Sequence, residues 1–490
     1  MPNWNTTHVL ILGAARQGIA LARWLARHGA NVTLSDSRRE EELASAKESL
    51  ADVNVTFVAG GHPLELLDNC DLLCPSGGVP LTLPIVEEAV RRGIPLSNDS
   101  QIFMEVVPCK TIGVTGSAGK TTTTTLVGEM AKLSFKDEGG RLALSEAEAM
   151  KDEENNAASD IHPSSFKIHP SVFIGGNIGD PLINYVDDMT ADDIAVLELS
   201  SFQLDQMTIS PNVAAILNVT PNHLDRHGTM EAYANAKARI LEFQSAKDTA
   251  VLGRDDKGAW DLKSRVKGNL LAFSLQDLDE GLNGAYLHDG LLSLRDGYAY
   301  VPLLTREKVQ LRGDHNVANV LAAFAIGHAA GFKLGDMLEA AEEFRGVPHR
   351  LEFVRELRGA RWYNDSIATA PERSMAAVHS FTEPIVLMLG GRDKKLPWDD
   401  LAKLIHERVD HVVVFGEAGE MIQKTVTGYS GVGGADVRRA TTLKEAVSLA
   451  AEVASAGDVV LLSPGGTSYD EFDDFAERGA AFRKWVSELP

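Results

Sequence analysis

The chain has 490 residues, of which 44% are hydrophobic and 24% are charged, and its formal net charge at pH 7 is −22. This length exceeds what one hydrophobic core usually organises, so we expect about three domains. The acidic balance argues against nucleic acid as the main partner, because phosphate backbones bind basic surfaces, and no apolar run approaches the ~18 residues of a membrane helix, so no membrane insertion is expected.

The first hundred residues alternate strand and helix patterns. Residues 8–38 contain an apolar strand, a glycine turn, an amphipathic helix and a second strand that ends at Asp36. This alternation predicts a Rossmann-like domain with a parallel sheet over residues 1–100. The turn "GAARQG" lacks the middle glycine of a dinucleotide loop, which counts against NAD.

Two further features of the chain bear on its location. The N-terminus carries no basic leader, so we expect no signal peptide. The three cysteines, Cys70, Cys74 and Cys109, form no CxxC pair, which suits a reducing compartment. We therefore expect a cytoplasmic protein.

A second α/β domain is predicted over residues 101–346, and it opens with "GVTGSAGKTT" from residue 113. A strand, a glycine-rich turn, Lys-Thr and a helix together form a phosphate cradle. Lys120 would supply positive charge, and the Thr121 hydroxyl would bind Mg²⁺. The predicted ATP loop comprises Gly116, Ser117, Ala118, Gly119, Lys120, Thr121 and Thr122.

Polar residues also follow the apolar strands of this second domain. Glu198 ends one strand, Asn218, His223 and Asp225 follow another, and Lys237 lies on an alanine-rich helix. Such residues are the expected partners of a nucleotide-bound metal. Taken singly, each also suits an ordinary structural role: a helix cap, a loop histidine or a solvated helix face.

Residues 134–169 interrupt this pattern. They contain an acidic stretch without a persistent apolar period, which predicts a solvated and partly disordered insertion to which we assign no chemistry. Beyond it, residues 347–490 show apolar strands in "RWYNDS", "PIVLMLGG", "HVVVFG" and "DVVLLSPGG" with helices between them. These predict a third, Rossmann-like α/β domain.

Several segments in this order resemble the cytoplasmic muramyl ligases of peptidoglycan synthesis. The markers are "GVTGSAGKTT", "GGNIGDPL", "LELSSFQLD", "NVTPNHLDRHG", "HNVANVLAA", "NDSIATAP" and "LLSPGGTSYDEFDDFAERG". The resemblance implies three domains, for a UDP-linked substrate, ATP and an amino acid. It implies a monomer and ATP-dependent amide formation, in which a substrate carboxylate becomes an acyl phosphate that an amine attacks.

The last two markers favour the branch that adds D-glutamate to UDP-N-acetylmuramoyl-L-alanine. A sister ligase with another acceptor amino acid remains an alternative, and the sequence does not separate D- from L-glutamate. From other classes, an NAD-linked oxidoreductase and a nucleotide-switched binding protein also remain as alternatives.

The resemblance assigns roles by position. Lys120, His223 and Lys237 would be catalytic; Thr121, Glu198, His223 and Lys237 would hold Mg²⁺, with Lys237 carbamylated by CO₂. Further nucleotide contacts would be Asn316, Asn319, Arg350 and Asp365. The UDP substrate would meet Arg16, Gln17, Asp36, Ser37, Gly78 and Asn177, and glutamate would meet Thr369, Lys394, Ser468 and Phe475. Ile367 departs from the family pattern, because many members have lysine there.

Overall fold

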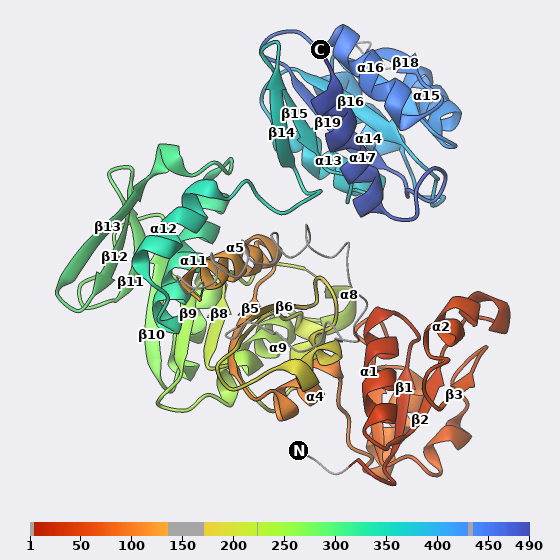
Figure 1. Cartoon of the computed structure of the whole chain (residues 1–490), viewed down its shortest axis with the longest axis vertical. Helices are drawn as coiled ribbons and strands as arrows, with labels where there is room; N and C mark the ends of the chain where they lie inside the picture. The colour runs from red at the N-terminus through yellow and green to blue at the C-terminus, as the bar shows by residue number, and fades with distance from the viewer. Residues whose placement is uncertain (1–3, 136–170, 223, 430–434) are drawn as a thin grey trace, which may run out of the picture. The chain divides into compact units, whose positions relative to one another are not determined.

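The computed structural model describes residues 4–135, 171–222, 224–429 and 435–490 (Figure 1). It contains three separate sheets, of four, nine and six strands, with helices packed on them. The α/β class and the three-domain organisation are thereby confirmed. The chain divides into two compact units, Met1–Phe344 and Arg345–Pro490, called unit 1 and unit 2 below. The acidic insertion lies outside the described residues except for its first two positions.

The N-terminal sheet has the order β3-β2-β1-β4, and all of its strand pairs are parallel, as the sequence predicts. Its strands are β1 His8–Leu12, β2 Asn31–Ser35, β3 Val55–Val58 and β4 Leu72–Pro75. Its helices are α1 Arg16–Arg27, α2 Ala44–Ser49, α3 Pro84–Arg92 and α4 Asp99–Val106. Close backbone packing requires glycine in the first turn of α1, because a Cβ on Gly18 would lie 2.0 Å from the Gly13 carbonyl oxygen.

The central sheet has the order β13-β12-β11-β10-β9-β8-β5-β7-β6. Its strands are β5 Lys110–Thr115, β6 Val172–Gly176, β7 Ile194–Glu198, β8 Val213–Ile216, β9 Thr249–Gly253, β10 Asn269–Ser274, β11 Gly284–His288, β12 Leu291–Asp296 and β13 Ala299–Thr305. The helices of this region are α5 Lys120–Ser134, α7 Ser201–Leu204, α8 Leu224–His227, α9 Met230–Glu242, α10 Lys257–Trp260, α11 Asp314–Ala330 and α12 Leu334–Glu343. Pairs from β6 to β11 are parallel, which confirms the predicted mostly parallel sheet.

Two antiparallel hairpins extend this sheet at its β13 edge, and the sequence analysis does not anticipate them. The turn between β11 and β12 is Asp289-Gly290, and both residues have positive φ. That geometry belongs to a two-residue hairpin turn of type I′, for which Asp-Gly is a strong signal. The signal was therefore present in the sequence.

One hydrophobic core joins the N-terminal sheet to the central sheet. It includes Trp24 from α1 and Leu34 from β2 of the N-terminal domain, and Leu197 from β7 and Ile216 from β8 of the central sheet. A second core lies where α5 and α11 cover the central sheet, and most of α11 is buried in it. The shared core explains why residues of both sheets belong to one compact unit.

Unit 2 contains the sheet β14-β15-β19-β16-β17-β18, in which only the β14–β15 pair is antiparallel. Its strands are β14 Glu352–Leu357, β15 Ala360–Asn364, β16 Ile385–Gly390, β17 His411–Phe415, β18 Asp436–Arg439 and β19 Val459–Gly465. Its helices are α13 Pro371–His379, α14 Asp399–Arg408, α15 Gly419–Gly428, α16 Leu443–Val453 and α17 Phe475–Glu488. The loops after β15, β16 and β19 leave the carboxyl edge of this sheet, where ligands of open α/β sheets bind.

Candidate active site

The glycine-rich loop lies between β5 and α5, as predicted, and other residues fix its shape. The backbone N–H of Ser117 donates to the Asn218 carbonyl at 3.0 Å, and that of Ala118 donates to Asn218 Oδ1 at 2.8 Å. Asn218 therefore holds the first half of the loop. Gly119 has a φ of +83°, and a Cβ there would lie 2.2 Å from Oδ1 of Asn319, so this position needs glycine.

A buried carboxylate lies at the start of α5. Glu198, at the end of β7, is 2% exposed, and strand pairing places it beside Val114 of β5. The Thr121 hydroxyl donates to its Oε2 at 2.8 Å, and Nδ2 of Asn177 donates to its Oε1 at 2.9 Å. A carboxylate, a hydroxyl and an amide in contact form an oxygen-rich set of the kind that suits Mg²⁺.

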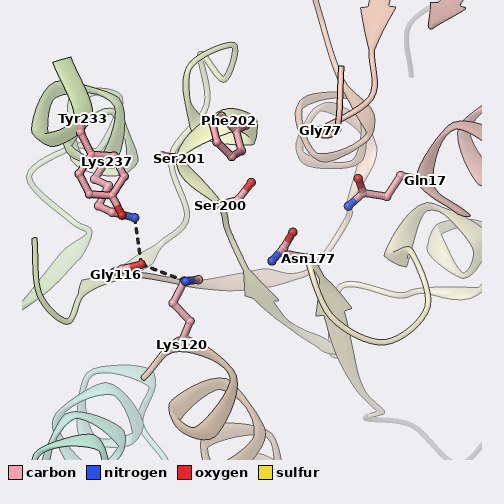
Figure 2. A pocket seen from close by; sticks show the side chains of 11 residues that line it. Gln17, Gly77, Gly116, Lys120, Asn177, Ser200, Ser201, Phe202, Tyr233 and Lys237 are labelled. Atoms are coloured by element: carbon pink, nitrogen blue, oxygen red, sulfur yellow. Dashed lines mark hydrogen bonds between the residues drawn. The ribbon is translucent and has the colours of Figure 1, made fainter. Parts of the chain in front are cut away.

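Two lysines converge on the carbonyl of Gly116. Nζ of Lys120 donates to it at 3.0 Å, and Nζ of Lys237, from α9, donates to it at 2.9 Å (Figure 2). Lys237 is 1% exposed, which contradicts the solvated-face alternative. Burial lowers the pKa of Lys237 to about 7, the nearby Lys120 cation lowers it as well, and Glu198 opposes them. Lys237 is therefore an amine that loses its proton readily near neutral pH.

A cavity of about 330 Å³ opens beside these lysines. Residues of the N-terminal domain and of the central domain line it together: Gln17, Gly77, Gly78, Gly116, Lys120, Asn177, Ser200, Ser201, Phe202, Tyr233 and Lys237. Nε2 of Gln17 donates to the carbonyl of Gly176 at 3.4 Å, next to Asn177 (Figure 2). We call this cavity the transfer cleft.

The transfer cleft brings together residues that the sequence analysis assigned to different ligands. Gln17, Gly78 and Asn177, predicted for the UDP substrate, lie in the same cavity as Lys120 and Lys237, predicted for phosphoryl transfer. Arg16 and Ser37 are exposed and do not line it. His223 lies outside the described residues, so its predicted role remains a prediction.

Asp36 is buried, and its carboxylate binds other residues of the N-terminal domain. Its carboxylate accepts hydrogen bonds from the backbone N–H of Ala14 at 2.7 Å and from the Arg38 guanidinium at 2.9 and 3.0 Å. These bonds from Arg38 hold the pKa of Asp36 well below its ordinary value, although burial opposes them. Asp36 therefore orders the turns after β1 and β2. Arg38 was not predicted, although it stands two residues after an acid at a strand end.

A second cavity of about 330 Å³ lies on the other side of the glycine-rich loop. Its lining includes Ala118, Gly119, Asn218, Asp255, Phe273, His315 and Asn319. Asn319 was predicted to contact the nucleotide. Asn316 does not line the cavity, but its Oδ1 accepts a hydrogen bond from Asn319 Nδ2 at 3.1 Å and so orients that side chain. Asp255, Phe273 and His315 were not predicted: no local motif marks Asp255 or Phe273, and His315 opens the marker "HNVANVLAA" but was assigned no role.

In unit 2, the predicted residues cluster on the loops at the carboxyl edge of the sheet. Asp365 is buried, accepts a hydrogen bond from the Ser463 hydroxyl at 2.8 Å, and has its pKa raised to about 7 by burial. Lys394 is exposed, and its Nζ donates to Oγ1 of Thr369 at 3.1 Å. Ser468 is buried, whereas Arg350 and Phe475 are exposed.

A fully buried arginine that the sequence analysis missed connects these loops. Arg478, on α17, donates to Oγ and the carbonyl of Ser366, each at 2.9 Å, and to the Gly466 carbonyl at 3.1 Å. The Ser366 hydroxyl in turn donates to the Phe475 carbonyl at 2.8 Å. Burial lowers the pKa of Arg478 to about 10, so it stays charged at neutral pH. Arg478 stands within the marker "LLSPGGTSYDEFDDFAERG", but no local pattern shows its role, since its partners lie up to 112 positions away.

Comparison with known proteins finds relatives along the whole chain. Three family descriptions match successive parts of the chain: "Mur ligase MurD-like, N-terminal domain" over residues 7–98, "Mur ligase middle domain" over 114–327, and "Mur ligase, glutamate ligase domain" over 349–466. A relative from Symbiobacterium thermophilum is 37% identical over 98% of this chain and 97% of its own length. One from Koribacter versatilis is also 37% identical, with the same coverage. Both relatives are named UDP-N-acetylmuramoylalanine–D-glutamate ligase.

Solved structures show the same fold at lower identity. The UDP-N-acetylmuramate–alanine ligase of Thermotoga maritima has a TM-score of 0.51 at 20% identity and covers 98% of this chain and all of its own. A UDP-N-acetylmuramoyl-L-alanyl-D-glutamate–2,6-diaminopimelate ligase has a TM-score of 0.52 at 18% identity, covering 94% and 93% of the two chains.

Proposed function

The chain belongs to the Mur ligase family, and from that premise we propose how its residues carry out the reaction. It is an ATP-dependent ligase that joins D-glutamate to UDP-N-acetylmuramoyl-L-alanine in peptidoglycan precursor synthesis. The substrate's alanyl carboxylate attacks the γ-phosphate of ATP, and ADP leaves. The glutamate amine then attacks the acyl phosphate, an amide forms, and phosphate leaves.

The transfer cleft supports this proposal more than any other feature. A free carboxylate is a poor acyl donor, so the reaction requires a phosphoryl group and a carboxylate in one enclosed space. In this chain, the loop that binds phosphate and the residues predicted for the UDP substrate line one cavity. Lys120 would offset the charge that develops on the transferring phosphoryl group.

The donor set around Glu198 fits a magnesium ion. We propose that Thr121 and Glu198 hold Mg²⁺, with His223 and Lys237 as further ligands; when bound, the ion would supply positive charge to the phosphate oxygens. Asn177 keeps the Glu198 carboxylate in position through its hydrogen bond. An unmodified ammonium at Lys237 would repel a metal ion.

Lys237 is therefore proposed to react with CO₂. Its neutral amine would form a nitrogen–carbon bond to CO₂ and lose a proton, which leaves a carbamate anion. Two observations support this: the side chain is almost completely buried beside Lys120, and burial brings its pKa down to about 7. Both features favour the neutral, nucleophilic amine.

Unit 2 is proposed to bind D-glutamate. Lys394 would pair with one carboxylate, and Thr369 and Ser468 would donate hydrogen bonds. Ile367 offers no cation at this site, whereas Lys394 does.

We further propose that Arg350 and Asp365 contact the nucleotide and that residues 344–348 form a hinge. The enzyme is also proposed to be a cytoplasmic monomer. None of the helices in the described part of the chain has the length and apolar character that crossing a bilayer requires.

One assay tests the function. The protein is incubated with ATP, Mg²⁺, UDP-N-acetylmuramoyl-L-alanine and D-glutamate, and each substrate is omitted in turn. Phosphate release that requires both substrates is expected, with L-glutamate as the matched control that gives no product. Equal release without either substrate would instead indicate a nucleotide-switched binding protein.

A further inference from the structure

An arginine on α8 reaches across from the central domain to a loop of the N-terminal domain. Nη2 of Arg226 donates to the Gly78 carbonyl at 2.5 Å, and Nη1 donates to the Gly77 carbonyl at 3.2 Å. Both glycines line the transfer cleft. Arg226 thus connects one wall of this cleft to the domain that carries the phosphate loop.

The Arg226 guanidinium also has a contact within the central domain. It lies 4.6 Å from the ring centre of Phe202, which also lines the transfer cleft. The His227 imidazole is stacked parallel to that ring at 5.1 Å, and its Nε2 lies 2.9 Å from Oγ of Ser201. A planar cation over an aromatic ring gains energy from the contact, and the ring restricts where the cation can lie.

The loop is held at its ends by hydrogen bonds, but its two central residues have no side chain that could hold them in place. Its two glycines carry no side chain to pack, and a Cβ on Gly78 would meet no atom within 4 Å. Backbone hydrogen bonds tie the ends of the loop: Ser76 donates to Leu12 at 2.9 Å, and Val79 donates to Ser76 at 2.8 Å. Between them, the fork of Arg226 holds two successive carbonyls, a pattern that a planar guanidinium fits and a lysine ammonium does not.

We propose that Arg226 is a positioning residue that fixes the Gly77–Gly78 turn over the transfer cleft, and so sets where the carboxylate of the UDP-linked substrate meets the phosphoryl group. It acts through the turn and does not touch the reacting atoms. The identity of the substrate rests on the proposed function, whereas the link between Arg226 and the turn rests on the contacts above.

The test compares Arg226→Ala and Arg226→Lys with Arg27→Ala, a surface arginine that pairs with Asp52. For Arg226→Ala, we expect KM for UDP-N-acetylmuramoyl-L-alanine to rise about 10-fold, since two charge-assisted hydrogen bonds are lost, with KM for ATP within about twofold of wild type. Arg226→Lys should recover little of this loss. Arg27→Ala should match the wild type.

Hydrogen exchange gives a readout that does not depend on turnover. The Val79 amide, whose hydrogen bond to the Ser76 carbonyl closes the turn, should exchange about 10-fold faster in Arg226→Ala, while the amides of β5 and β7 stay unchanged. Unchanged exchange in this loop would overturn the proposal, as would full recovery of KM in Arg226→Lys, because charge alone would then suffice. If the wild type itself shows no substrate-dependent phosphate release, the proposed function is wrong. The hydrogen-exchange measurement would still test whether Arg226 holds the turn.

Discussion

Each unit buries a cation beside its predicted binding residues, but the two cations differ in chemistry. Unit 1 buries the primary amine of Lys237, and unit 2 buries the guanidinium of Arg478. Burial brings the pKa of Lys237 to about 7, whereas that of Arg478 falls only to about 10. At neutral pH the Lys237 amine can therefore lose its proton and become neutral, whereas the Arg478 guanidinium remains charged.

Their hydrogen bonds follow the same division. Lys237 and Lys120 both donate to the Gly116 carbonyl, and Lys237 also donates to Oγ1 of Thr115 at 3.4 Å, so its contacts stay within the strand end and loop that precede α5. Arg478 donates to three acceptors on two loops that meet at the sheet edge. The comparison teaches that a buried charge serves either chemistry or architecture, and that the choice of amine or guanidinium decides which.

Exchanging the type of cation in unit 1 should have the largest effect. Lys237→Arg keeps a positive charge but removes the amine that can react with CO₂. We expect kcat to fall about 10³-fold, the scale of losing one electrostatic contributor in a transfer site. Steady-state kinetics would measure it, with Lys132→Arg on the exposed side of α5 as the matched control.

Mass spectrometry completes this test. The wild type kept under CO₂ should gain the mass of one CO₂ on the peptide containing Lys237, and its activity should fall when CO₂ is removed. A fully active Lys237→Arg variant, or a wild type indifferent to CO₂, would show that Lys237 is a structural cation like Arg478.

Removing the buried cation of unit 2, Arg478, should lower the stability of this unit more than it lowers the rate of the reaction. Arg478→Met leaves the carbonyls of Ser366 and Gly466 without their donor, and unsatisfied buried groups cost about 1–3 kcal/mol each. We expect a loss of about 3 kcal/mol in the opening free energy of β15 and β19, measured by hydrogen exchange in the full chain. The amides of β5 in unit 1 serve as the internal reference.

The matched control for this variant is Arg483→Met on the same helix. Arg483 pairs with Glu352 at 2.8 Å, but its side chain is 39% exposed, so the expected loss is under about 1 kcal/mol. KM for D-glutamate should rise in Arg478→Met and stay unchanged in Arg483→Met. If both variants lose the same stability, Arg478 does not organise these loops.

The sequence predicts those parts of the molecule that local patterns encode. The alternating strands and helices, the turn before α5 and the polar residues at strand ends each depend on a few neighbouring residues, and the structure has the corresponding strands, turn and helices. The β11–β12 hairpin also had a local signal in Asp289-Gly290, which the analysis did not use.

Residues with long-range roles escaped prediction. Arg226 is 148 positions from Gly78, and Arg478 is 112 positions from Ser366. An arginine on an exposed helix and one in the core look alike in sequence, because the acceptors that distinguish them come from other elements. The same reason explains why the hydrogen bond from Asn319 to Asn316 was not foreseen; the predicted nucleotide contact of Asn316 remains a prediction.

The smallest expected effect is a pH dependence of the stability of unit 2 that arises from Asp365. Measuring it shows whether unit 2, like unit 1, contains a group that changes its protonation near neutral pH. Burial raises its pKa from an ordinary 3.8 to about 7, so between these values the folded chain holds a proton that the unfolded chain has lost. Stability must then fall as pH rises through this window, by up to about 1.36 kcal/mol per pH unit for one proton. When the pH rises from 4.5 to 6, we expect the opening free energy of β15 and β19 to fall by about 2 kcal/mol in the wild type. The Asp365→Asn variant cannot ionise at this position and should not show this fall. Hydrogen exchange at several pH values, corrected for intrinsic rates, would measure the difference. Parallel pH profiles for the two proteins would mean that Asp365 is ionised in the folded chain, and that the hydrogen bond from Ser463 outweighs burial.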